Sequence, residues 1–545
     1  MDIIKIQSWS LYADFIDLFS HINYRGFPIV LFCNFQRFLN HPHVKNCIES
    51  GQLNGHLKNE ILKRNQIQPK FDKIMNSLIV SSTVDYKTGK IALFDEINLR
   101  FNEDSYLQNF DESTTVILRK SPDTTKFLGI PVHSLGEYKT SIKEVENEIY
   151  SEIKKVFTQN QTHPFFKLQI VNKRFYEEIN DILEWLPAII NYFDNNKISC
   201  VILGGAGESF SRMLITVAKT KGIPSICMQH AMMGADRGWL PTFATKEAVY
   251  SNYEKTFFLG AGVPEDRIEI IGHPKYDIIF NKEFISRKLF CEKLGFDHRK
   301  QVILLATQPM FWDLNFIKTL VASLLKHQFQ IIIKPHPTEL KSSYIKENWV
   351  NLYQQLAEKS NSIKLIVDNL ELYDILANVD IVCLHYSTVG LEAGLFEKPT
   401  IYTAKNQFDG PYYDYCNQLV ATTPIEIAKL AFKICKNNKY KLELQNQQKQ
   451  LILEAYKHKF AGLNLSNLIH RMTGIISSKN KLKFPNGTLV KGTGVKIFII
   501  ENGLKRHIPS PVVFAELGFN PNDILIINDN VLETIPNGPQ LEERV

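Results

Sequence analysis

The sequence predicts an α/β protein with two doubly wound, Rossmann-like units and a small C-terminal β-rich module. From about residue 197, short β-branched runs alternate with turn residues and helical periodicity, a pattern typical of βαβ units. A second series of the same kind begins near residue 300. Because the predicted strands are apolar on both faces, we expect parallel sheets covered by helices.

The first unit is predicted from residue 197 and extends back to the N-terminus. Its strands are expected at 199–205, 223–230, 247–252 and 267–274, with a helix at 208–222. Further upstream, GFPIVLFCNF (26–35) and TTVILRK (114–120) are interpreted as strands, and 141–157 and 175–193 as helices. We interpret residues 1–285 as one N-terminal domain with insertions.

The second unit repeats the alternation, and a tail of different character follows it. Strands are expected at 301–308, 330–337, 363–369, 380–387 and 399–404, and helices at 316–327, 370–379 and 441–477. Residues 286–478 are interpreted as the second domain. Residues 479–545 have closely spaced Asn-Gly turns, short strands and one short helix, which predicts a separate β-rich module.

Bulk properties narrow the class of protein. With 545 residues, 44% hydrophobic and 22% charged, the chain is globular and long enough for several domains. A net charge of +6 is mild for this length, so an anionic ligand or membrane surface is allowed and a nucleic-acid binder is not predicted. Eight cysteines without a CxxC pair, no signal peptide and no long apolar run predict a cytoplasmic protein, at most peripheral to a membrane.

One strand of the second unit runs directly into charged and titratable residues. In FQIIIKPHPTEL, three isoleucines precede Lys334, and His336 stands between Pro335 and Pro337. The prolines restrict the backbone, so less entropy is lost when the two side chains face a ligand. An ammonium beside an imidazole suits a phosphate or diphosphate. The alternative is an ordinary strand end with a surface lysine and a capped histidine.

Hydroxyl side chains follow another strand of the second unit. Ser387 and Thr388 stand where a helix N-cap is expected, and the helix is predicted to run through Glu392 towards Lys398. Hydroxyls and free backbone N–H groups at a helix start are typical of an anion site. Glu392 lies one turn after Thr388, where its carboxylate could accept hydrogen bonds from ribose hydroxyls.

The first unit has candidate residues at three strand ends. GGAGESFSR contains Gly205 and Glu208, but it lacks the third glycine of GxGxxG, so a dinucleotide fingerprint is not predicted. His230 and His273 each end a later strand. Ligands of open α/β sheets bind at the carboxyl ends of the strands. Together with His336, three histidines at such positions favour a function over coincidence.

The order of these motifs resembles bacterial surface-polysaccharide transferases of the GT-B fold. The resemblance covers about residues 197–475 and rests on GIPSICMQHAMMG, NYEKTFFLGAGVPEDRIEIIGHPKYD, IIIKPHP and HYSTVGLEAGLFEKPTI. Within that group the chain looks like the capsule polysaccharide, polysialyltransferase and CDP-glycerol glycerophosphotransferase families. It is more distantly similar to UDP-N-acetylglucosamine 2-epimerases. The tail resembles a small repeat module of bacterial surface proteins.

The resemblance implies a metal-independent GT-B glycosyltransferase, or a sugar-alcohol phosphate transferase, of surface polysaccharide synthesis. It would move a group from a nucleotide-activated donor to a glycan or lipid-linked acceptor, without a further cofactor, at the inner face of the plasma membrane. Residues 1–285 would be the acceptor side and residues 286–478 the donor side. The resemblance implies phosphate contacts from His336, Ser387 and Thr388, a ribose contact from Glu392, and Glu208 or His230 as the base. Lys334, Gly205 and His273 are also expected at the donor site, and His336 is expected to act in catalysis.

Two departures from the pattern leave alternatives open. His230 is followed by Ala231 where those families usually have glycine, and no acidic pair followed by glycine, typical of polysialyltransferases, is found. The first alternative is a 2-epimerase of UDP-N-acetylglucosamine, which needs no acceptor. The second is a catalytically inactive glycan-binding protein with the tail as its binding part.

Overall fold

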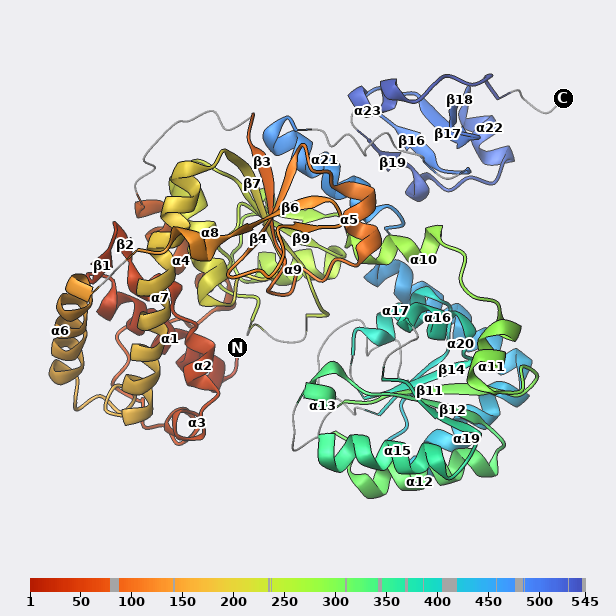
Figure 1. Ribbon diagram of the computed structural model, residues 1–545, viewed down its shortest axis with the longest axis horizontal. Coiled ribbons are helices and arrows are strands. Elements are labelled where there is room, and N and C mark those ends of the chain that lie inside the picture. Colours follow the sequence, from red (N-terminus) through yellow and green to blue (C-terminus); the bar gives the residue numbers. More distant parts are fainter. Residues whose placement is uncertain are drawn as a thin grey trace.

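The computed structural model describes the chain apart from residues 79–87, 141–142, 234–235, 237, 309–310, 342–345, 368–370, 386, 404–418, 457, 476–483, 485, 528 and 542–545. Two large, mainly parallel sheets and a smaller third sheet organise the described residues. Figure 1 shows the two large sheets in separate units, with the third sheet in a small blue module near the C-terminus. The predicted fold class is therefore confirmed.

The first sheet has eight strands in the order β10-β9-β8-β7-β3-β4-β6-β5. All its pairings are parallel except that of β5 with β6. The strands are Lys90–Phe94 (β3), Thr115–Arg119 (β4), Lys126–Phe127 (β5), Ile130–Ser134 (β6), Ile198–Leu203 (β7), Ser225–Met228 (β8), Lys246–Val249 (β9) and Ile268–Ile270 (β10). Alternate residues face two cores: Phe94 and Leu203 pack into one, and Leu93 and Ile202 into the other. Helices therefore cover both faces, as the apolar strands predict.

Helices α1, α2, α3, α6 and α7 enlarge the first unit on the side away from the C-terminal module (Figure 1). The helices of this unit are Ile3–Phe19 (α1), Phe35–Leu39 (α2), Pro42–Glu49 (α3), Ile67–Ser77 (α4), Glu103–Asn109 (α5), Lys143–Gln159 (α6), Gln169–Asn195 (α7), Ser209–Thr220 (α8), Asn252–Gly260 (α9) and Asp277–Asn281 (α10). The predicted helices at 141–157, 175–193 and 208–222 correspond to α6, α7 and α8. The strand predicted at 114–120 is β4.

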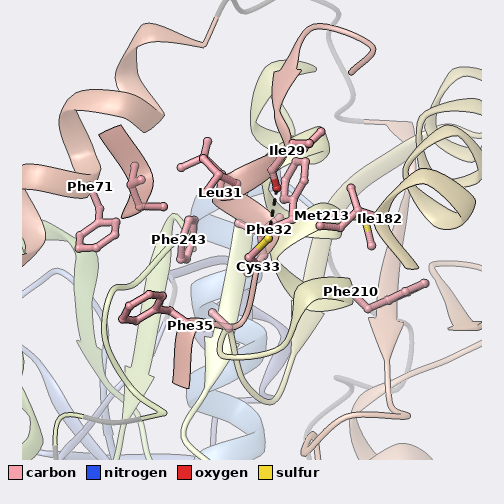
Figure 2. Close-up of a cluster of buried hydrophobic side chains, with 14 of the residues drawn as sticks. Ile29, Leu31, Phe32, Cys33, Phe35, Phe71, Ile182, Phe210, Met213 and Phe243 are labelled. Carbon is pink, nitrogen blue, oxygen red and sulfur yellow. Dashed lines mark hydrogen bonds between the residues drawn. The ribbon is translucent and has the colours of Figure 1, made fainter. Parts of the chain in front are cut away.

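The strand predicted at 26–35 is wrong. Of this segment, Phe27–Pro28 (β2) forms a strand, in a short hairpin with Asn23–Tyr24 (β1), and Ile29–Phe32 forms a 3-10 helix. Figure 2 shows this segment surrounded by side chains of α4, α7 and α8, among them Phe71, Ile182 and Phe210. A short apolar run that is buried on all sides gives no periodicity with which to distinguish a strand from a helical turn.

The second sheet has five parallel strands in the order β13-β12-β11-β14-β15. They are Val302–Ala306 (β11), Gln330–Lys334 (β12), Ile363–Leu365 (β13), Ile381–Leu384 (β14) and Thr400–Tyr402 (β15). The helices around them are Arg287–Leu294 (α11), Leu314–Lys326 (α12), Pro337–Lys341 (α13), Asn351–Glu358 (α15), Leu372–Asn378 (α16), Val389–Leu395 (α17), Pro424–Lys436 (α19) and Asn438–Ala455 (α20). Alternate strand residues again face two separate cores. All five strands fall within the ranges predicted from the sequence.

The helical tract predicted at 441–477 consists of two helices with different neighbours. α20 ends at Ala455, and α21 spans Ala461–Thr473. Leu465 and Leu468 of α21 pack into the core on the first sheet. The last helix of the range predicted as the second domain therefore lies on the first unit. The boundary predicted between 285 and 286 stays a prediction, and that between 478 and 479 lies outside the described residues.

The C-terminal module has a four-stranded sheet in the order β18-β17-β16-β19. Its elements are Leu489–Lys491 (β16), Ile497–Glu501 (β17), Leu504–Ile508 (β18), Pro511–Glu516 (α22), Leu525–Ile526 (β19) and Asp529–Thr534 (α23). Its core contains Val490 and Ile500 together with Leu463 of α21. The β-rich tail predicted from the sequence is thus present, and it packs against the first unit.

Candidate active site

The carboxyl ends of β3 and β7 form the switch point of the first sheet. These strands are neighbours, but the chain continues from β3 to β4 on one side and from β7 to β8 on the other. Ligands of open α/β sheets bind at such a point. A Cβ atom on Gly204 would lie 2.0 Å from the carbonyl carbon of Asn98. Glycine is therefore required here, because it lets the loop after β3 lie directly on the end of β7.

His230 lies at this edge, two residues after the end of β8. Its ring stacks on Trp239 with the ring centroids 4.6 Å apart, and its Nδ1 has no hydrogen-bond partner among the described residues. Burial lowers the pKa of His230 to about 4, and the charge of Arg100 acts in the same direction. The imidazole is therefore neutral at pH 7 and can accept a proton. A Cβ on Gly205 would lie 3.5 Å from Cε1 of His230, so Gly205 borders the ring.

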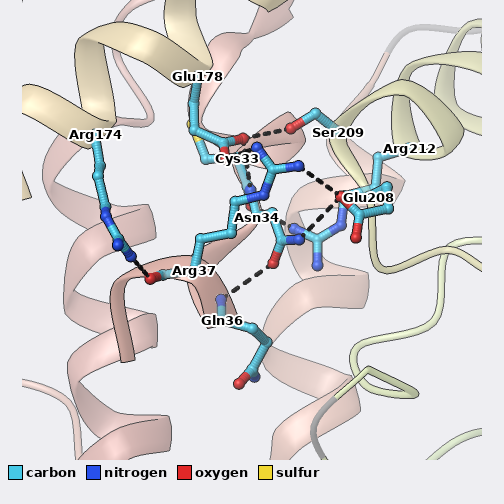
Figure 3. A network of polar contacts seen from close by, with 9 residues as sticks. All are labelled: Cys33, Asn34, Gln36, Arg37, Arg174, Glu178, Glu208, Ser209 and Arg212. Atoms are coloured by element: carbon cyan, nitrogen blue, oxygen red, sulfur yellow. Dashed lines mark hydrogen bonds and ion pairs between the residues drawn. The ribbon is translucent and has the colours of Figure 1, made fainter. Parts of the chain in front are cut away.

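Glu208 precedes α8 and is held in a network of ion pairs and hydrogen bonds (Figure 3). Arg37 donates from Nη2 to Glu208 Oε2 and from Nη1 to Glu178 Oε1, both at 3.1 Å. Asn34 Nδ2 also donates to Glu208 Oε2, at 3.2 Å, and the Ser209 hydroxyl donates to Glu178 at 2.5 Å. The carboxylate of Glu208 is thus already engaged by two donors.

A pocket of about 330 Å³ opens beside Glu208. Its lining combines acids, cations and an indole ring, including Glu96, Asn98, Lys120, Trp185 and Glu208. His230 does not line this pocket; a Cβ on Gly205 would lie 3.8 Å from Nδ2 of Asn98, which does line it, and 3.5 Å from Cε1 of His230. Hydrogen-bonding groups of both kinds beside an aromatic face suit a ligand rich in hydroxyls.

Lys275 and Glu392 connect the two units. Lys275 follows β10 in the first unit, Glu392 lies on α17 in the second, and Lys275 Nζ is 3.5 Å from Glu392 Oε1. The hydroxyl of Tyr373 donates to the same oxygen at 3.4 Å. Lys275 is 8% exposed and Glu392 is 5% exposed. Burial lowers the pKa of the lysine and raises the pKa of the glutamate, while their mutual attraction opposes both changes.

The charge of Arg100 acts on titratable residues of both units. It is an exposed residue of the loop after β3, with a left-handed φ of 53°. Burial is the main cause of the lowered pKa of His230 in the first unit and of His336 in the second. The positive charge of Arg100 lowers both pKa values further. It also acts on Lys275 and Glu392. The guanidinium is therefore within electrostatic range of both sheet edges.

In the second unit, a buried glutamate holds the loop that carries His336. Glu339 Oε2 accepts from the backbone N–H of His336 at 2.7 Å and from the Thr307 hydroxyl at 2.6 Å, while Oε1 accepts from Tyr353 at 2.9 Å. His336 Nδ1 accepts from the Thr338 N–H at 3.2 Å. The ring is therefore oriented by its own loop, next to Lys334 at the end of β12.

The residues after β14 lie at the switch point of the second sheet, because β14 and β11 are neighbours while the chain leaves them in opposite directions. Thr388 is the N-cap of α17 without a side-chain capping bond, and Ser387 Oγ accepts from the Val389 N–H at 3.3 Å. The ring of His385 stacks on Phe311 with the centroids 4.3 Å apart. Phe311 is 50% exposed. An exposed aromatic ring at this edge can stack on a planar ligand group.

His273 has a different environment from the other predicted histidines. It is 0% exposed, with Nε2 3.0 Å from the Leu99 carbonyl oxygen and Nδ1 accepting from the Lys275 N–H at 3.2 Å. Burial lowers its pKa well below the usual value. Both ring nitrogens are engaged by the backbone, so neither is available to bind a nucleotide-activated donor.

The other predicted residues form two groups, one at each sheet edge. Gly205, Glu208 and His230 lie in the first unit, and Lys334, His336, Ser387, Thr388 and Glu392 in the second. Sequence reasoning did not select Lys275, Arg100, Glu339 and His385. Only Glu339 had a usable signal, because an acid three residues after His336 matches the spacing of a capping box.

Residues 242–459 match the family model of CDP-Glycerol:Poly(glycerophosphate) glycerophosphotransferase. The predicted resemblance is confirmed. The matched segment covers less than half of the chain; it includes Lys275, His336 and Glu392 but neither Glu208 nor His230. At the level of this family, the predicted class of transferase with a nucleotide-activated donor is also confirmed.

Several solved structures resemble the chain at low identity. Anabaena HepE in complex with UDP and glucose is 12% identical, with a TM-score of 0.45, covering 71% of this chain and 100% of its own. The wall teichoic acid polymerase TagF is 14% identical, with a TM-score of 0.43, covering 81% and 98%. S. aureus MnaA with UDP is 11% identical, with a TM-score of 0.44, covering 71% and 98%. At these values the likeness does not indicate a ligand for this chain.

Three further observations complete the comparison. No curated protein matches the chain in sequence. None of the described helices has the length and apolar character needed to span a membrane. Within the described residues, no three side chains of His, Cys, Asp or Glu are grouped so that they could hold a metal ion.

Proposed function

We propose that the protein transfers a phosphorylated polyol or a glycosyl group from a nucleotide-activated donor to a hydroxyl of a glycan or lipid-linked acceptor. The donor would bind along the second sheet edge, at His336, Ser387, Thr388 and Glu392. The acceptor would enter the 330 Å³ pocket of the first unit. A polyol phosphate donor is favoured, because the matching family model describes a glycerophosphotransferase.

The observation that carries the proposal is the shared electrostatic field of the two units. Arg100 acts on His230 and on His336, and Lys275 contacts Glu392 across the units. The neutral imidazole of His230 and the cations Arg100 and Lys275, all in the first unit, meet what transfer from a nucleotide bound at the second unit requires. The base takes the proton of the attacking hydroxyl, and the cations stabilise charge on the leaving phosphate.

In this proposal His230 is the base and Glu208 positions the acceptor. Nδ1 of His230 has no partner among the described residues, whereas Glu208 is engaged by Arg37 and Asn34. As the acceptor oxygen bonds to the phosphorus of the transferred group, the bond from that phosphorus to the leaving nucleotide oxygen breaks. The hydroxyl proton moves to His230, and Arg100 and Lys275 face the nucleotide phosphate that leaves.

A donor screen tests the proposal. We expect at least one of the CMP-, CDP-, UDP- and GDP-linked donors to raise the melting temperature, and His336→Ala and Glu392→Ala to abolish that shift. No stabilisation by any donor would contradict the proposal. Incubation with a UDP-sugar alone also separates transfer from epimerisation, because only an epimerase would convert the donor without an acceptor.

The nucleotide that is released identifies the transferred group. A polyol phosphate transfer from a CDP-linked donor releases CMP, since one phosphate stays with the product. A glycosyl transfer releases the nucleoside diphosphate. We expect CMP, measured by ion-exchange chromatography after incubation with CDP-glycerol and an acceptor.

We also propose that the reaction needs no metal ion, because Arg100 and Lys275 can supply the positive charge that faces the leaving phosphate. The rate should then be the same with EDTA and with added Mg²⁺. A loss of more than tenfold in EDTA that Mg²⁺ restores would contradict this part of the proposal.

Action at the inner face of the plasma membrane belongs to the proposal as well. The net charge of +6 favours association with an anionic surface. Co-sedimentation with vesicles that contain anionic lipid should exceed that with neutral vesicles and should fall as salt increases. Equal sedimentation with both kinds of vesicle would contradict it.

A further inference from the structure

A second cavity, of about 650 Å³, lies between the C-terminal module and the first unit. Its walls come from β10, α10, α21 with the residues just before it, and the strands and loops of the module. Figure 1 shows the module beside α21. None of the residues that line the 330 Å³ pocket contributes to this cavity. Its volume is within the range of pockets that bind small molecules.

The walls of this cavity are held by an apolar contact. Leu463 of α21 is buried in one cluster with Val490, Ile500 and Ile527 of the module, and Phe460 packs against that cluster. Because burial of these side chains fixes the module on α21, the cavity is part of the folded protein.

Amide and aromatic side chains line parts of the cavity, beside aliphatic residues such as Ile271 and Leu525. The amides are Asn281, Asn464, Asn467, Asn486 and Asn520, and the aromatic rings are Phe280, Phe460 and Phe519. An amide can donate to one hydroxyl and accept from another. An aromatic face packs against the C–H face of a sugar ring. This combination suits a saccharide.

The charges in the cavity favour an uncharged ligand. Arg471 is 2.9 Å from Glu269, and Lys246 is 3.2 Å from the other oxygen of Glu269. Lys459 and Asp523 contribute one charge of each sign. The lining therefore has no marked excess of positive charge, which a polyphosphate would require.

One amide of the lining has a donor atom without a partner in the described part of the chain. Asn467 lines the cavity and is 6% exposed, and its Nδ2 has no hydrogen-bond partner among the described residues. Such groups are rare, because a buried donor normally has an acceptor. A hydroxyl of a ligand in the cavity would supply that acceptor after a small rotation of the side chain. The neighbouring Asn464 is anchored by a bond from its Nδ2 to the Ile271 carbonyl oxygen at 3.2 Å.

We propose that this cavity binds a neutral saccharide segment of two or more sugar units. Its binding does not depend on the transfer reaction. The further statement that the segment belongs to the acceptor chain, held while its end reaches the first sheet edge, rests on the proposed function.

The test is a titration of the full-length protein with maltotetraose and with chitotetraose, by calorimetry and without any donor. We expect a Kd below the millimolar range for at least one of them, weakened at least tenfold in Asn464→Ala and in Asn467→Leu. The matched control is Asn172→Ala, a partly buried asparagine of α7 whose Nδ2 also donates to a backbone carbonyl. It should leave the Kd unchanged.

Several outcomes would overturn the inference. The inference is wrong if neither saccharide binds the wild type. It is also wrong if Asn464→Ala binds with the same affinity as the wild type. Binding of poly(glycerol phosphate) alone would replace the neutral ligand by an anionic one. Asn464→Ala keeps the test decisive if Asn467→Leu fails to fold. Because no donor is present, failure here leaves the proposed transfer reaction intact.

Discussion

Two histidines of the first unit follow strands on either side of β9, and their surroundings differ. His230 stacks on Trp239, and its Nδ1 has no hydrogen-bond partner among the described residues. His273 is fully buried, with both ring nitrogens bonded to the backbone. Their sequence signals are the same, a titratable ring after a strand. The difference arises from packing that neither motif encodes.

The largest expected effect is on the rate, at His230. Replacing the proposed base in His230→Ala should lower kcat/KM by about 10³-fold, within the range typical of general-base catalysis. The melting temperature should change little, since the ring is only partly buried. Steady-state assays of nucleotide release measure this effect, and His298→Ala, at an exposed histidine, is the control. Activity within tenfold of the wild type would exclude His230 as the base.

At His273 the effect should be on stability. His273→Ala creates a cavity and leaves the Leu99 carbonyl and the Lys275 N–H unpaired, which should cost about 3 kcal/mol. Urea denaturation followed by fluorescence of the full chain measures the loss. His21→Ala, at an exposed histidine, should change stability by less than about 0.5 kcal/mol. If His273→Ala were as stable as the wild type but had strongly reduced turnover, His273 would have a role in the reaction and not in stability.

The contact between the units should have a moderate effect. Glu392→Gln keeps the shape of the side chain but removes the charge that faces Lys275 and, in the proposal, part of its capacity to accept ribose hydrogen bonds. We expect the KM for the donor to rise about tenfold, equivalent to about 1.4 kcal/mol, with kcat within threefold. Glu397→Gln, on the exposed end of the same segment, is the control. An unchanged KM would remove Glu392 from the donor site.

The smallest effect should be a shift of the pH profile. Because burial and Arg100 lower the pKa of His230 to about 4, the base stays unprotonated as the pH falls from 7 to about 5. The acid limb of kcat/KM should therefore lie near pH 4. In Arg100→Ala the protonated ring is no longer repelled, so its pKa rises and the limb moves to higher pH, by up to about one unit. Arg100→Lys should restore the original limb, and a wild-type limb near pH 6.5 would contradict the assignment.

The sequence was sufficient to predict the elements whose pattern is regular. The five strands of the second sheet were predicted as short apolar runs that alternate with turn residues and helices, and α6, α7 and α8 were predicted from their helical periodicity. The strand Lys90–Phe94 was not recognised, although it stands at the centre of the first sheet. It is a short apolar run in an N-terminal region whose remaining elements show no regular strand–helix alternation, so the local pattern alone did not reveal it.

Of the candidate site, only the residues at the ends of strands or at the start of a helix could be predicted from the sequence. His230, His336 and Glu392 were selected because they follow strands or begin a helix. Lys275 and Arg100 were not, since the role of a lysine or arginine depends on which charges face it in the folded chain. Their partners lie far away in the sequence, and a single sequence does not show that Lys275 meets Glu392.

The chain passes between the units twice, and this has a mechanical consequence. The outgoing pass follows α10, and the returning pass joins α20 to α21. In the returning pass, the Tyr456 hydroxyl accepts from the N–H of His273 at 3.0 Å and donates to the His273 carbonyl oxygen at 3.2 Å. Asp277 accepts from the N–H groups of Ala461 and Gly462 at 2.8 and 2.7 Å. The two passes are thus clamped together beside Lys275. A rotation of one unit against the other about this clamp would, in the proposed function, change the separation between the donor site and the acceptor site.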